Sequence, residues 1–210
     1  MTTTSAVQAL AQRDPRLAEA IQIIGPCTLV RGRGSPYESL LSAIAHQQLH
    51  GNAAGAILRR LKELYPGTRY PTPEELLATP VAALRGAGLS GAKLAAMQDV
   101  ARHALEGTVP DRRRIQRLSD AAIIERLTAV RGVGRWTAEM LLMFTLNRPD
   151  VLPVDDFGIR EGFRLLYRKR AQPTPRSLAL FGERWAPYRT TASWYLWRYL
   201  DDQRARRRAR

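Results

Sequence analysis

Apolar residues recur along the chain at intervals of three and four, the spacing that lines one face of an α-helix. Leu40, Leu41, Ile44 and Ala45 form such a face. No stretch alternates apolar and polar residues over the length of a strand, so the pattern predicts an all-α fold. Helices are expected over residues 17–25, 36–49, 53–65, 74–79, 81–86, 90–105, 119–130, 135–146, 157–163, 174–185 and from 187 onward.

Capping residues and prolines mark several of the expected helix starts. Ser35–Glu38 and Thr72–Glu75 are capping-box arrangements with proline at the first helical position. Asp14-Pro15 marks another start. Residues 1–13, which precede it, are expected to form a loose segment.

The stretch Leu127–Arg160 combines two features that suit a phosphate-bearing ligand. Gly132-Val133-Gly134 lies between two helical patterns, and so tight a hairpin needs backbone angles that glycine adopts cheaply. The first free N–H groups of the next helix then offer a phosphate site. Asp155 and Asp156 follow about twenty residues later. Each is a candidate helix cap, and each is also a candidate reactive carboxylate.

Composition narrows the class of partner. The 210 residues contain 33 Lys and Arg against 19 Asp and Glu, a net charge of +14, and the pI is about 11.0. Such an excess favours a polyanionic partner, although it is also compatible with a merely solubilising surface. The single cysteine, Cys27, excludes an internal disulfide and a four-cysteine iron–sulfur loop. No apolar run approaches the roughly 20 residues of a membrane span, and the first residues do not resemble a secretion signal.

Two motifs in the central stretch resemble those of a known family. The segments L-x-x-V-R-G-V-G-R-W-T-A-E-M and L-P-V-D-D-F-G-I-R are similar to the helix–hairpin–helix and Gly/Pro…Asp signature of the HhH-GPD DNA glycosylases. The W-A-P-Y-R and W-Y-L-W segments near the C-terminus strengthen the likeness. Within the superfamily the chain is most similar to the 3-methyladenine DNA glycosylase II (AlkA-type) branch, in a compact form without the extra N-terminal domain.

The resemblance implies a fold, an activity and a set of partners. The fold would be two-lobed and helical, with the active site in the cleft. The protein would flip alkylated bases (3-methyladenine, 7-methylpurines and related lesions) out of damaged duplex DNA and hydrolyse the N-glycosidic bond, which initiates base excision repair. We expect a monomer in the cytoplasm, associated with the nucleoid, without an iron–sulfur cluster or another cofactor. The expected organisation is an N-terminal segment (residues 1–34), a glycosylase domain (35–200) and a basic tail (201–210).

The same resemblance assigns the catalytic residue and the type of glycosylase. Asp156 stands three residues before Ile159, as the family's reactive aspartate does before its helix, and Asp155 is then a cap or supporting residue. A carboxylate near the sugar stabilises an oxocarbenium-like transition state. Trp136 occupies the slot of the lysine nucleophile of lyase-type members, and no lysine lies between Lys93 and Lys169. A monofunctional glycosylase is therefore expected.

Aromatic residues are the main candidates for the base pocket. Trp136 would stack on a cationic purine by cation–π attraction, although an ordinary core tryptophan is the alternative. Met140 departs from the family, which commonly has an aromatic residue there, so the lesion preference stays open. The full set of expected pocket residues is Trp136, Met140, Phe157, Tyr188 and Trp194. Trp194 has a core position as its alternative.

The remaining expected contacts are with the DNA backbone and the minor groove. Gln48 and Leu49, with His50 nearby, resemble the family's wedge, which fills the hole left by a flipped base, and Ser90 resembles a second insertion point. The hairpin residues expected to bind DNA are Arg131, Gly132, Gly134, Arg135 and Thr137. By resemblance, the main-chain carbonyls of Thr128, Val130 and Val133 would hold Na⁺ or K⁺. The arginine-rich tail, residues 203–210, is expected to be a disordered DNA contact.

Two other functions fit parts of the sequence. A non-catalytic hairpin module would need Gly132 and Gly134 but neither Asp156 nor an aromatic pocket. A glycosylase for deaminated or oxidised bases is a closer rival, which Trp136 and the missing cysteines disfavour. A zinc site is not expected, because the three histidines lack acid or cysteine partners at ligand spacing.

Overall fold

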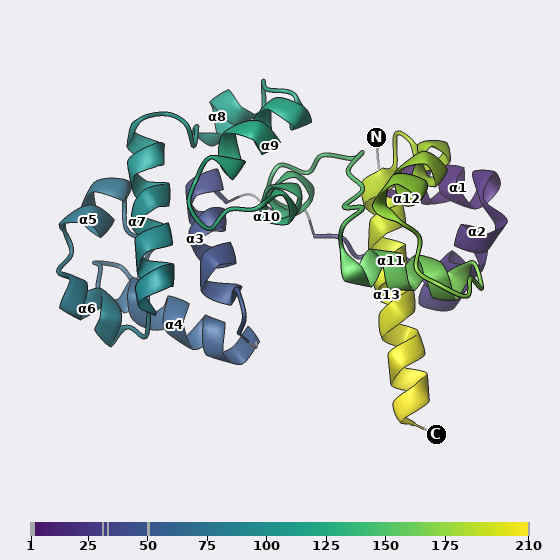
Figure 1. Cartoon of the computed structure of the whole chain (residues 1–210), viewed down its shortest axis with the longest axis horizontal. Helices are drawn as coiled ribbons and strands as arrows, with labels where there is room; N and C mark the ends of the chain where they lie inside the picture. The colour runs from purple at the N-terminus through teal and green to yellow at the C-terminus, as the bar shows by residue number, and fades with distance from the viewer. Residues whose placement is uncertain (1–2, 31, 33, 50, 210) are drawn as a thin grey trace. The chain divides into compact units, whose positions relative to one another are not determined.

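The structure is a computed structural model that describes residues 3–30, 32, 34–49 and 51–209. Every regular element among these residues is a helix, which confirms the all-α prediction (Figure 1). The chain folds into two compact units. Unit 1 combines residues 1–31 with 147–210, and unit 2 is the continuous segment 32–146.

Unit 1 is built from the two ends of the chain. Its helices are α1 (Thr3–Arg13), α2 (Pro15–Ile24), α11 (Phe157–Leu166), α12 (Pro175–Gly182), the 3₁₀ turn η2 (Glu183–Trp185) and α13 (Arg189–Arg208). The long helix α13 packs against α11, α2 and α1 (Figure 1). The approach of α11 to α13 is close, because a Cβ at Gly162 would lie 2.2 Å from the carbonyl oxygen of Leu196. Only glycine allows these two backbones to approach so closely.

A buried carboxylate ties the N-terminal helices to the rest of unit 1. Asp14 is 3% exposed and caps α2 by accepting the N–H groups of Arg16 and Leu17. Its other oxygen accepts the Tyr167 hydroxyl and the Trp185 indole N–H, the latter at 2.9 Å. All of these bonds satisfy a charge that would be costly to bury alone.

Unit 2 is a bundle arranged around α7. Its elements are α3 (Pro36–His46), α4 (Gly51–Glu63), α5 (Pro73–Ala78), α6 (Val81–Gly86), α7 (Gly91–Leu105), α8 (Arg112–Ile115), α9 (Asp120–Thr128), α10 (Arg135–Met140) and the π-helical turn η1 (Leu141–Thr145). Helix α7 contacts α3, α5 and α6 (Figure 1). The capping residues predicted from sequence are confirmed: Ser35 caps α3, and Thr72 and Glu75 complete a full capping box on α5.

Three predictions about the elements were wrong. Residues 3–13 form α1 rather than a loose segment, because Leu10 is fully buried in the core of unit 1. The helix expected over 135–146 changes to π-helical geometry after Met140, with Leu146 N–H donating to Leu141 O. The basic tail is not disordered as far as Arg208, since α13 continues to that residue.

Candidate active site

The hairpin between α9 and α10 has one glycine with a special backbone and one without. Gly132 has φ +77°, and a Cβ there would lie 3.0 Å from the Cβ of Ala96, so this position requires glycine. Gly134 caps α10 with φ −87°, which any residue adopts. The prediction that the whole turn needs glycine angles is therefore correct only for Gly132. Gly134 instead leaves open space beside the start of α10.

The other hairpin residues divide into exposed and buried positions. Arg131 and Arg135 are exposed, as expected for residues that meet a phosphate backbone. Arg131 N–H donates to Asp99 Oδ2 at 2.8 Å, which fixes the hairpin to α7 and lowers the pKa of the Asp99 carboxyl. Thr137 is only 5% exposed. Its side chain faces into unit 2, so the predicted DNA contact of this residue, which stays a prediction, would be made by its main-chain N–H in the first turn of α10.

A cavity of about 550 Å³ lies beside the hairpin in unit 2. It is lined by Ala43, His46, Gln47, Gln48, Trp136, Thr137, Met140 and Phe144. Trp136 is 48% exposed, so it is not the core tryptophan of the alternative interpretation. The structure thus brings Trp136 and Met140 together with Gln48, as a base pocket beside a wedge would require. Its size is that of an ordinary small-molecule site.

Phe144 in this cavity was missed by the sequence analysis. The π-helical turn inserts one extra residue per turn, and Phe144 on that turn is 37% exposed although its neighbours Met143 and Thr145 are buried. π-turns inside α-helices occur frequently at functional sites. The regular α-helix expected here does not predict an exposed Phe144, and the amino-acid pattern contained no signal of the π-helical turn.

The predicted wedge lies where α3 ends. Gln48 has a left-handed backbone, φ +56°, and both Gln48 and Leu49 are exposed. His50 lies outside the described residues. Gln47 was interpreted from the sequence as a polar residue at a helix end. In the structure its Nε2 donates to Gly132 O at 2.8 Å. The wedge segment and the hairpin are therefore joined by a side-chain hydrogen bond.

In unit 1, Asp156 is the N-cap of α11. Its Oδ1 accepts two hydrogen bonds of 2.8 Å, one from Ile159 N–H and one from Trp197 Nε1–H. Asp155 is exposed and is not the cap, so the first of the two roles predicted for it is wrong, and the second, a supporting residue, stays a prediction. Trp197 reaches Asp156 because Gly158 leaves room: a Cβ there would lie 2.9 Å from the indole ring. The sequence analysis had not selected Trp197.

The other predicted aromatic residues of unit 1 have different environments. Phe157, the first residue of α11, is 61% exposed. Tyr188 is half-buried, and the guanidinium of Arg13 lies 5.7 Å from the centre of its ring. Trp194 is 8% exposed and packs edge-on against Tyr195 in the hydrophobic core. It is therefore a core residue rather than a pocket residue, because its position on α13 faces inward.

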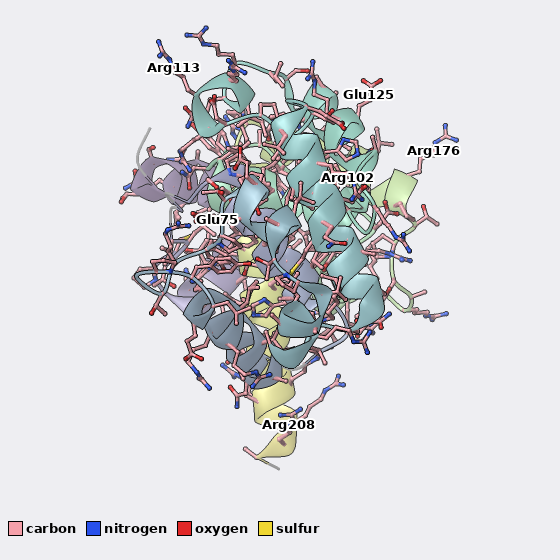
Figure 2. All side chains as sticks on the ribbon, turned by 90° about the vertical axis from the view of Figure 1, so that its left-hand side faces the viewer. Glu75, Arg102, Arg113, Glu125, Arg176 and Arg208 are labelled. Carbon is pink, nitrogen blue, oxygen red and sulfur yellow. The ribbon has the colours of Figure 1, made fainter. Side chains whose placement is uncertain are left out.

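Ser90 and the basic residues also have clear structural positions. The Ser90 hydroxyl caps α7 by accepting Lys93 N–H, and the residue is exposed. Arg112 binds the carbonyls of Gly32 and Gly34, so this arginine supports the fold of unit 2. Figure 2 shows Arg113, Arg176 and Arg208 extending outward from their helices. These three belong to the exposed positive charge of the protein.

In the part of the chain that the structure describes, no group of three or more His, Cys, Asp and Glu side chains is arranged to hold a metal ion. No helix within that part is both long and apolar enough to cross a membrane.

Comparison with known proteins decides the family. The model of the HhH-GPD superfamily base excision DNA repair protein matches residues 41–187, more than half of the chain. The chain belongs to this superfamily. Among relatives of this HhH-GPD protein, DNA-3-methyladenine glycosylase 1 of Schizosaccharomyces pombe is 44% identical over 163 residues, 78% of this chain and 72% of that protein.

Solved structures agree with this assignment. A Schizosaccharomyces pombe 3-methyladenine DNA glycosylase in complex with abasic DNA superposes with a TM-score of 0.82 and 39% identity, covering 92% of this HhH-GPD chain and 95% of the other. A DNA-3-methyladenine glycosidase from Bacillus halodurans gives a TM-score of 0.83 and 38% identity, with 94% and 89% covered. The expected helical HhH-GPD fold is confirmed.

Proposed function

We propose that this protein is a monofunctional DNA glycosylase that releases alkylated bases from duplex DNA and so initiates base excision repair. The observation that carries the proposal is that the chain has an HhH-GPD hairpin, Trp136 on a cavity, and a carboxylate, Asp156, that is oriented by two hydrogen bonds. A hairpin module that only binds DNA needs neither of the last two. The named 3-methyladenine glycosylases among its relatives support the same substrate class.

The hairpin and the wedge prepare the substrate in the proposed mechanism. The exposed arginines and N–H groups of the hairpin hold a backbone phosphate, and Gln48 and Leu49 fill the space that the flipped nucleotide leaves. The flipped base enters the cavity and stacks on Trp136. A base alkylated at N3 or N7 carries positive charge, so the electron-rich indole face favours it over a normal purine.

Asp156 acts on the sugar rather than on the base. An alkylated, cationic purine is already a good leaving group, and the difficulty is the positive charge that develops on the sugar. The carboxylate stabilises this charge and orients the attacking water. Trp136 stands in the slot of the lyase lysine and cannot form a Schiff base, so the product is an abasic site with an intact strand.

The proposal includes three further features that the sequence suggested. The protein acts as a monomer, and it works on the nucleoid in the cytoplasm. The main-chain carbonyls of Thr128, Val130 and Val133 would hold Na⁺ or K⁺, and such an ion would add positive charge beside the bound phosphate.

The decisive experiment is base release from methylated duplex DNA, with the released bases separated by chromatography. We expect free 3-methyladenine and 7-methylpurines. The DNA strands should stay intact until alkali cleaves them at the abasic sites. Duplex binding is measured in parallel on the same preparation. Binding without any base release would overturn the alkylation proposal, and release of hypoxanthine or oxidised purines instead would establish the rival glycosylase. Strand breaks without alkali would contradict the monofunctional assignment.

A further inference from the structure

A lysine on α7 holds the end of α3, the helix that leads into the wedge. Lys93 Nζ donates to the main-chain oxygens of Ala45 and Gln47, the second at 2.9 Å. The side chain is half-buried, and this burial lowers the pKa of its ammonium. Lys93 lies in the first turn of α7, where the helix macrodipole disfavours a cation. The carbonyl end of α3 supplies the compensating negative potential.

Lys93 completes the hydrogen bonding of the turn that carries the wedge. The carbonyls of Ile44 and His46 accept the N–H groups of Gln47 and Leu49. The carbonyls of Ala45 and Gln47 alternate with these two along the chain, and they accept hydrogen bonds from Lys93. The next residue, Gln48, has φ +56°, a conformation that persists only where its surroundings hold it.

The same helix also holds the hairpin. Asp99 Oδ2 accepts Arg131 N–H at 2.8 Å, and Ala96 lies against Gly132. Lys93 and Asp99 are six residues apart, which is about 9 Å along a helix. Gln47 connects the wedge segment directly to the hairpin, because its side chain donates a hydrogen bond to Gly132 O. Helix α7 thus fixes the spacing between the wedge segment and the phosphate-binding hairpin.

We propose that Lys93 is a positioning residue for base flipping: it holds Gln48 and Leu49 at the distance from the hairpin at which they enter the helix stack. This inference rests on the function proposed above. Lysine suits the position because a compact ammonium reaches two neighbouring carbonyls, whereas the planar fork of arginine is built for carboxylates and phosphates. Only three of the 33 basic residues in the chain are lysines.

The test compares Lys93→Met with a matched control, Lys62→Met. Lys62 is in the last turn of α4, and its ammonium lies 3.9 Å from the centre of the Tyr70 ring. Two readouts are used: single-turnover release of 3-methyladenine, and fluorescence of 2-aminopurine placed beside the lesion, which reports unstacking. For Lys93→Met we expect release to fall by about 10- to 100-fold, since two charge-assisted hydrogen bonds are lost. The fluorescence change falls with it, while affinity for abasic duplex DNA stays within about threefold because the hairpin phosphate contacts remain.

A double-mutant cycle separates positioning from general support. With the wedge removed by Gln48→Ala and Leu49→Ala, Lys93→Met should cost less than about threefold, because it acts only through the wedge. An equal loss with and without the wedge, or no loss in either readout, would refute the inference. If Lys93→Met does not fold, Lys93→Arg replaces it, with a smaller loss of the same kind expected.

The fluorescence readout keeps this inference distinct from the proposed function. It requires binding and unstacking but no release of the base. A wild-type protein that unstacks the lesion without releasing it would overturn the proposed function and still test Lys93. Normal release by Lys93→Met would overturn the positioning role and leave the proposed function intact.

Discussion

Replacing Asp156 by asparagine separates its role as the cap of α11 from the catalytic role proposed for it. The hydrogen bonds from Ile159 N–H and Trp197 Nε1–H converge on the same atom, Oδ1. The single carbonyl oxygen of asparagine can therefore accept both of these bonds. Asp156→Asn keeps the cap, removes the negative charge and replaces Oδ2 by an amide N–H donor.

The expected magnitudes of the two effects differ widely. Asparagine is about as good an N-cap as aspartate, and the lost charge at the helix start costs about 0.3–1 kcal/mol. A carboxylate about 4 Å from a developing positive charge contributes about 4 kcal/mol at an effective dielectric constant of 20. A loss of that size is about a thousandfold in rate. We therefore expect Asp156→Asn to retain nearly normal stability and to lose about three orders of magnitude in base release.

The assay is single-turnover release of 3-methyladenine, measured beside thermal unfolding and duplex binding. The matched control is Asp155→Asn, which removes the same charge from the neighbouring exposed residue and should leave release within about threefold, because a fully solvated charge is strongly screened. Asp156→Ala also loses the cap, at about 0.5–2 kcal/mol, so its unfolding temperature should fall as well. Undiminished release by Asp156→Asn would refute the catalytic role and leave this residue as a helix cap. A large loss in Asp155→Asn alone would move the role to Asp155.

Three further predictions concern stability and recognition. The Arg164 guanidinium holds the pKa of Glu161 down to about 2, so the ionised carboxylate contributes its full stability above pH 4.5 and loses it as the pH falls towards 2. Between these two pH values the free energy of unfolding should decline more steeply in the wild type than in Glu161→Gln. Urea titrations that show the same decline in both proteins would contradict this. Gly132→Ala should destabilise the protein by about 1–2 kcal/mol and weaken duplex binding, because φ +77° is left-handed and Ala96 is close; an unchanged urea midpoint and affinity would count against the hairpin geometry. Trp136→Leu should reduce release of cationic 7-methylguanine by about 10- to 30-fold more than release of neutral hypoxanthine, measured in competition on one duplex; an equal loss for both would exclude a cation–π contribution.

Features set by neighbours in the chain were predictable from the sequence. Ser35 and Thr72 cap their helices because a cap and the N–H it binds lie three residues apart. The same local spacing places Asp156 against Ile159, although the cap had been predicted at Asp155. Trp136 and Met140 were assigned to one pocket by the family resemblance, and both line the cavity, a turn apart on α10.

Features set by contacts distant in sequence were not predictable. Trp197 meets Asp156 across 41 residues, and Gln47 meets Gly132 across 85, and no pattern along the chain records either contact. Helix α1 is short and forms because α2 and α13 cover Leu10, since an isolated helix of this length is marginal in water. The inward direction of Trp194 follows from how α13 packs, which helical spacing alone leaves open.

The division of unit 1 between the two ends of the chain has a consequence for synthesis on the ribosome. Residues 1–31 emerge first, but their packing partners begin only at residue 147. At about 5–20 residues per second, the roughly 115 residues in between take about 6 to 23 s to translate. During that interval Leu10 and Leu17, fully buried in the finished protein, lack the later part of their cover, α11 and α13. Helices α1 and α2 thus expose apolar side chains during this interval, and a chaperone that recognises exposed apolar segments can bind them before α13 emerges.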